Sequence, residues 1–165
     1  MIRATSLPAS ALTNPYRLSG AYCDCYFTDL PRTVSHAEYV EAFYTTALFK
    51  LERCLLRLAV SRPSTDAEAR ELARGERDAF AAWTVEARAP DQVLLCDFKG
   101  HTRSWLMVAP AEAPGGTRLY FGSVVVPARN ARTGNSGMPA VHRSLLGFHK
   151  LYSRMLLSAT ARRLA

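Results

Sequence analysis

The C-terminal part of the chain carries a long amphipathic pattern, and this pattern most constrains what the chain can fold into. It predicts a helix of about six turns with one apolar face, which would begin near Pro139. Such a helix needs an apolar surface to cover, so the rest of the chain has to supply one. The apolar residues recur in steps of three and four, at Val141, Leu145, Phe148, Tyr152, Met155 and Ala159.

The segment between residues 78 and 126 supplies that surface, because its apolar residues alternate with a period of two. We expect four strands joined by short antiparallel connections, at residues 80–88, 92–98, 102–109 and 117–126. One more strand is expected at residues 21–28, ahead of two helices. The sequence therefore predicts an α+β domain in which a curved antiparallel sheet of five or more strands grips the C-terminal helix.

The two helices inserted after the first strand are indicated by their capping signals. Ser35 and Glu38 form a capping box, and an apolar stripe follows them to about residue 60. A second capping box begins a shorter, more polar helix, which ends at a glycine; its residues are Thr65, Glu68 and Gly75.

The sequence predicts an N-terminal arm followed by a single domain. Residues 1–18 are expected to form an irregular arm because prolines and small polar residues break any pattern there. Residues 19–165 are expected to form a single domain, since a chain of 165 residues is the size of one domain. No apolar run is long enough for a membrane span or a signal peptide, so a cytoplasmic location is expected.

The charge balance of the chain raises one alternative function. The chain has 21 Lys and Arg residues against 14 Asp and Glu residues, a net charge of +7, which is compatible with nucleic-acid binding. The basic residues are spread along the chain rather than clustered, so a solvated basic surface is the preferred interpretation.

The cysteines give little support to a cofactor or metal site. Cys23 and Cys25 fall on one face of the expected first strand, and with Asp24 they could form half of a metal site. Small buried thiols are the preferred interpretation, because no Cys-x-x-Cys pair is present. We expect a reducing compartment and no cofactor.

The order of elements resembles the helix-grip fold of the START-related (SRPBCC) superfamily, which includes birch-pollen-allergen-like proteins and polyketide cyclases. The segments at residues 98–105, 117–123 and 148–154 look like those of uncharacterised bacterial members. The resemblance implies a cavity between the concave face of the sheet and the last helix, of the kind that holds apolar molecules. It carries over no catalytic residue, because catalytic groups vary between branches of the superfamily.

Six residues are candidates for lining such a pocket: Asp97, Arg103, Trp105, Tyr120, His149 and Tyr152. Asp97 and Arg103 flank the turn at Gly100 at equal distances, so a symmetric hairpin would place them opposite each other. Such a pair could anchor a polar ligand group, or it could be a solvent-exposed salt bridge. His149 also has two interpretations: it could act as a general base in the cavity, or it could be a structural histidine.

We therefore expect a protein that binds a small apolar or amphipathic molecule in an internal pocket, with no assigned reaction. A cyclase- or dehydratase-like enzyme on the same fold, with His149 or Asp97 as proton carrier, is one alternative. A basic protein that binds nucleic acid is another, although a helix across the sheet would cover the face on which bases stack. A homodimer through an exposed sheet edge is also compatible with the sequence.

Overall fold

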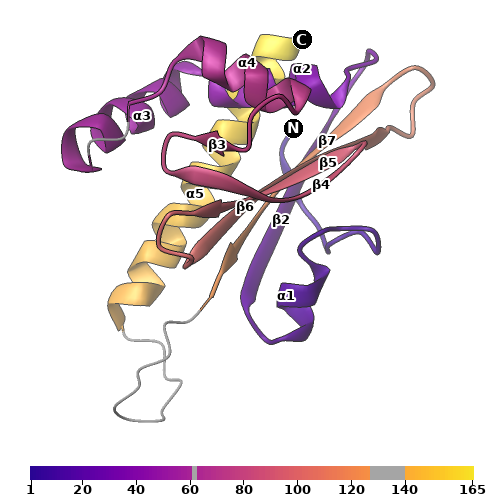
Figure 1. Ribbon diagram of the computed structural model, residues 1–165. Helices are drawn as coiled ribbons and strands as arrows, with labels where there is room; N and C mark the ends of the chain where they lie inside the picture. The colour runs from indigo at the N-terminus through magenta and orange to yellow at the C-terminus, as the bar shows by residue number, and fades with distance from the viewer. Residues whose placement is uncertain (61–62, 127–139) are drawn as a thin grey trace.

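The computed structural model describes residues 1–60, 63–126 and 140–165, with side chains in these ranges except at 55–60 and 140–149. Pro139 and the side chains of Val141, Leu145 and Phe148 thus lie outside the described residues. Figure 1 shows the elements in chain order: β1 (Arg3–Ala4), α1 (Asn14–Leu18), β2 (Tyr22–Leu30), α2 (His36–Tyr44), α3 (Ala47–Val60), α4 (Asp66–Arg74), β3 (Ala79–Phe80), β4 (Trp83–Ala89), β5 (Gln92–Asp97), β6 (Thr102–Pro110), β7 (Thr117–Val125) and α5 (Ala140–Leu164).

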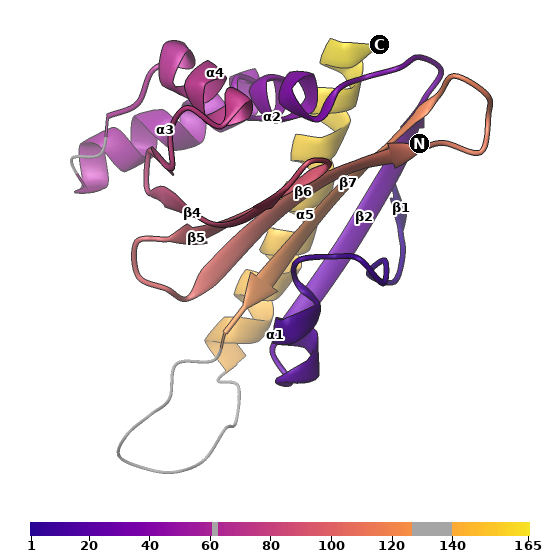
Figure 2. The same cartoon turned by 45° about the vertical axis from the view of Figure 1, so that its right-hand side comes forward.

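The strands form one antiparallel sheet in the order β1-β2-β7-β6-β5-β4-β3. Figure 2 shows α5 lying across the concave side of this twisted sheet. The predicted α+β class, with a curved antiparallel sheet that grips the C-terminal helix, is confirmed. The sheet has seven strands because β1 and β3, of two residues each, add to the five expected from the sequence.

The alternation of apolar and polar residues predicts one strand over residues 80–88, but the structure has two strands here, β3 and β4. Phe80 pairs with Trp83, so residues 80–83 form a tight hairpin turn rather than a continuous strand. Ala81 has φ 53°, the left-handed conformation that the first central residue of such a turn requires. Alanine gives no turn signal, and this is why the sequence predicts one strand over both segments.

The apolar face of the sheet under α5 holds the larger core cluster. Leu95, Leu106 and Phe121 of the central strands pack there against Phe43 of α2 and Leu157 of α5. Burial of side chains of this size contributes roughly 1.5–3 kcal/mol each, so this layer is the main source of the fold's stability.

The opposite face of the sheet is covered by the N-terminal arm. Ala11 of the arm is buried against Leu94, Trp105 and Met107. The Gln92 side chain fixes the arm there: its Oε1 accepts from the Leu12 backbone N–H at 3.0 Å and from Trp105 Nε1 at 2.8 Å. The arm that was expected to be irregular therefore contains β1 and α1 and packs on the sheet.

The single helix predicted between Ser35 and residue 60 is wrong, because the chain breaks it into α2 and α3 at two threonines. The Thr45 hydroxyl donates to the Glu41 carbonyl at 2.6 Å, which ties up an acceptor at the end of α2. The Thr46 hydroxyl oxygen accepts from the Phe49 backbone N–H at 3.2 Å and so caps the start of α3. The helices inserted after β2 therefore number three, with α4 as the third, among the described residues.

The close packing of β7 against its neighbours predicts a large cost for adding one carbon atom. A Cβ at Gly122 would lie 2.7 Å from the Asp24 carbonyl oxygen and 2.9 Å from Trp105 Cε3, and both atoms are held in the sheet. We expect Gly122→Ala to lower the free energy of unfolding by about 1–3 kcal/mol, measured by urea denaturation. Thr84→Ala, at an exposed position of β4, is the control and should change it by less than about 0.5 kcal/mol. Equal stability of Gly122→Ala and wild type would contradict this packing.

Candidate functional site

A cavity of about 500 Å³ lies between the sheet, α3 and α5. Its volume falls within the range of roughly 300–1,000 Å³ that is usual for small-molecule sites. The described residues that line it are mainly apolar and come from both layers, among them Phe43, Phe49, Trp83, Phe121, Leu151 and Leu156. The cavity thus lies between the sheet on one side and two helices on the other, and it is partly open to solvent where the exposed side chains of Leu51, Leu151 and Met155 line it.

The direction of α3 explains why space remains here. Both views show α3 running away from α5 after the turn at Thr45–Thr46 (Figures 1 and 2). The first turns of α3 place Leu48, Phe49 and Glu52 at the cavity, while α2 packs directly on the sheet through Tyr39 and Phe43. A continuous helix would have followed the line of α2 instead, so the two-threonine break is part of the site's construction.

The described lining of the cavity contains one carboxyl group, that of Glu52, which is partly buried. The Tyr152 hydroxyl of α5 donates a hydrogen bond to the carboxylate of Glu52 of α3. Burial raises the pKa of Glu52, and the hydrogen bond from Tyr152 opposes part of that rise. Burial and the neighbouring Glu52 together raise the pKa of Tyr152, so its hydroxyl stays protonated and serves as a donor.

Two further polar groups at the cavity lack a hydrogen-bond partner within the described part of the chain. They are the hydroxyl of Ser153, a residue that is 1% exposed, and the indole N–H of Trp83. Leaving a buried polar group without a hydrogen bond costs about 1–3 kcal/mol. Such groups are therefore available to hydrogen-bond a polar group of a bound molecule. Ser104 of β6 also lines the cavity. The arrangement can therefore hold an apolar body and hydrogen-bond a polar substituent.

The predicted pairing of Asp97 with Arg103 is wrong, because the hairpin of β5 and β6 is centred between Lys99 and Gly100 and not on Gly100. Arg103 pairs with Cys96, whereas Asp97 pairs with Trp83 of β4. This shift of one residue places the two side chains on opposite faces of the sheet. Asp97 Oδ1 accepts from the backbone N–H groups of His101 and Thr102, at 2.7 and 3.1 Å, and thus stabilises the turn.

The Arg103 side chain belongs to the face that carries the N-terminal arm, although residue Arg103 also contributes to the cavity wall. Its Nε donates to the Glu86 carboxylate at 3.1 Å, and its guanidinium lies 4.6 Å from the centre of the Tyr16 ring. Glu86 sits at a β-bulge of β4, where the register shifts between Val85 and Ala87. Its carboxylate also accepts from the Tyr16 hydroxyl, so this cluster fastens the arm.

Trp105 and Tyr120 also lie in the cluster on the arm face. Trp105 is 0% exposed and donates its indole N–H to Gln92, while Tyr120 packs with its ring centre 6.1 Å from that of Trp105. The described lining of the cavity does not include either residue. Tyr152 is the proposed site residue whose side chain lines the cavity, and the side chain of His149 lies outside the described residues.

Sequence reasoning missed Glu52, which the structure places at the cavity. One signal for it was present: Glu52 follows Leu48 and Phe49 by four and three residues, so it shares their helix face. A charge on the apolar face of a helix is unusual and indicates a buried partner. That partner, Tyr152, is 100 residues away in the chain, and no local pattern could have identified it.

The described residues give little support to a metal site, a disulfide or a membrane-spanning helix. Asp24 is engaged within the sheet, where its Oδ1 accepts from the Ser123 hydroxyl at 2.6 Å and from the Ser123 N–H at 3.0 Å. Within the described ranges, no group of three or more potential metal ligands gathers, and none of the cysteines forms a disulfide. A search of the same ranges finds no helix with both the length and the apolar character needed to cross a membrane.

The partly buried Glu52 carboxyl, whose pKa is raised, predicts a pH-dependent difference in stability between the wild type and Glu52→Gln. The folded protein favours the protonated carboxyl, so it retains a proton that the unfolded chain releases as pH rises. The free energy of unfolding of the wild type should therefore fall relative to Glu52→Gln as pH rises from about 4 to 7, by at most about 1.4 kcal/mol per pH unit. Urea denaturation at several pH values measures this, with Glu76→Gln on the exposed surface as the control. A difference that is constant or grows in the opposite direction would contradict the burial of Glu52.

Comparisons with known proteins add little to this geometry. No protein-family model matches the chain, and no curated protein matches it. Among solved structures, CalU16 from Micromonospora echinospora is similar over 99% of this chain and 90% of its own, with 10% sequence identity and a TM-score of 0.32. A TM-score this low does not establish a common fold, so the helix-grip arrangement described here rests on strand order and on the position of α5.

Proposed function

We propose that the protein binds a small apolar or amphipathic molecule in the cavity between the sheet, α3 and α5. An apolar lining is combined here with two buried polar groups, Ser153 Oγ and Trp83 Nε1, that have no hydrogen-bond partner among the residues the structure describes, and this combination supports the proposal. Ligand sites of proteins are built in this way, with a mostly hydrophobic wall and a few polar groups that fix orientation. Tyr152, Glu52 and Ser104 are the other polar groups that we propose for ligand contact.

Proton transfer is a second candidate function, and the partly buried Glu52 at the cavity favours it. A general acid or base works best with a pKa near the working pH, and burial moves the pKa of Glu52 in that direction. In the cyclase- or dehydratase-like alternative, we propose Glu52 in the role first considered for Asp97 or His149. The proposal is tested by the exchange of solvent deuterium into a bound β-diketone, which should slow in Glu52→Gln if Glu52 carries the proton.

Nucleic-acid binding receives less support from the geometry. Bases stack on aromatic side chains of an open sheet face, but α2 and α5 cover one face here and the N-terminal arm covers the other. Trp105, the aromatic residue at the centre of the sheet, is 0% exposed.

Filling the cavity should abolish ligand binding without unfolding the protein. In Ser153→Phe the new ring would occupy the cavity, and we expect the affinity for N-phenyl-1-naphthylamine, a neutral apolar fluorescent probe, to fall at least about tenfold. Ser153→Ala is the matched control, because it removes the hydroxyl but leaves the space; its probe affinity should stay within about twofold of wild type. Circular dichroism checks that both variants fold. Unchanged probe binding by folded Ser153→Phe would show that the probe binds elsewhere.

A further inference from the structure

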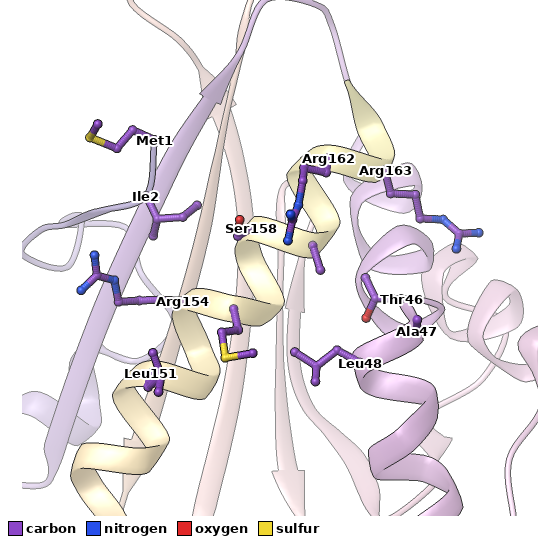
Figure 3. A pocket seen from close by; sticks show the side chains of 12 residues that line it. Met1, Ile2, Thr46, Ala47, Leu48, Leu151, Arg154, Ser158, Arg162 and Arg163 are labelled. Carbon is purple, nitrogen blue, oxygen red and sulfur yellow. The ribbon is translucent and has the colours of Figure 1, made fainter.

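A groove on the outer side of α5 adjoins the cavity. It has a volume of about 890 Å³ and lies between the N-terminal segment, α5 and the start of α3, as Figure 3 shows. Its floor is apolar and includes Ile2, Leu48, Leu151, Met155 and Ala159. Exposed apolar side chains that gather in a groove are a common feature of ligand-binding sites.

The groove and the cavity are neighbours that share three lining residues. Leu48, Leu151 and Met155 line the cavity and the groove alike. Leu151 is 59% exposed and Met155 is 47% exposed, and exposed side chains change rotamer rapidly. One elongated molecule can therefore extend from the groove into the cavity while the helices keep their positions.

The charge at the groove is entirely positive among its described residues. Arg154, Arg162 and Arg163 line it, and its described lining contains no Asp or Glu. Arg163 donates to the Thr45 carbonyl at 3.0 Å and so helps to end α2. Arg154 and Arg162 form no ion pair with any described residue; in Figure 3 Arg154 extends toward Ile2, and Arg162 is turned back along α5.

We propose that this groove binds the acidic head group of a free amphiphile, such as an alkyl carboxylate, whose unbranched apolar chain enters the cavity. The inference rests on the proposed ligand-binding function and names the class of its ligand. Arg154 and Arg162 would donate charge-assisted hydrogen bonds to the head group. Charge complementarity selects an acidic occupant, and it disfavours a second copy of this chain, which would bring arginines against arginines.

The test compares ligands that share one chain and differ only in head group. Laurate, lauryl alcohol and lauryltrimethylammonium, each below its micelle concentration, compete with N-phenyl-1-naphthylamine for the wild type and for Arg154→Gln/Arg162→Gln. We expect laurate to bind the wild type about tenfold more tightly than the alcohol, and the cation to bind most weakly. The double variant should lose this preference but still bind the alcohol. Added salt should weaken the preference in the wild type, because the head group stays near solvent.

Arg17→Gln/Arg70→Gln removes the same charge from exposed positions that do not line the groove, and it should keep the preference for laurate. Equal displacement by laurate and lauryl alcohol in the wild type would overturn the head-group site and leave the proposed cavity function standing. Failure of every ligand and of the probe to bind would overturn the cavity function itself. Co-sedimentation with phosphatidylglycerol vesicles that depends on both arginines, without a preference for laurate, would overturn the free amphiphile in favour of a membrane surface.

Discussion

The packing of α5 against the concave face of the sheet is the contact on which the rest of the structure depends. Leu156 and Leu157 are buried there, and without this layer Leu95, Leu106 and Phe121 would face water. The N-terminal arm covers the other face of the sheet, and hydrogen bonds of the Gln92 side chain join the arm to the strands. With both faces covered, the space for a ligand remains where the helical layer is incomplete, between α3 and α5.

Two threonines determine where that layer is incomplete. Their hydroxyls end α2 and cap α3, so α3 diverges from α5 and brings Glu52 toward Tyr152. The break therefore shapes the cavity and brings together its Glu52–Tyr152 carboxyl–phenol pair. Because the groove beside α5 shares Leu48, Leu151 and Met155 with the cavity, the same break also positions the entrance that we infer.

The sequence predicted the elements that local patterns determine and missed what distant contacts determine. The two capping boxes, the period-two strands and the amphipathic C-terminal helix were readable because each depends on residues within a few positions. The pairing of Arg103 with Cys96 was not readable, since a shift of one residue in a turn reverses the face of every side chain after it. Trp105 is an example. The alternation pattern correctly places it in a strand, but only the three-dimensional fold shows that its side chain lies on the face that the arm covers.

We propose that the space between the sheet, α3 and α5 holds a small molecule. Methyl NMR of the protein with bound N-phenyl-1-naphthylamine tests it most directly, because each face of the sheet carries its own methyl groups. We expect nuclear Overhauser contacts from the probe to methyl groups of Leu156 and Leu48, which line the cavity. Contacts to Leu94 and Met107 on the arm face instead, or none to the cavity methyl groups, would contradict it.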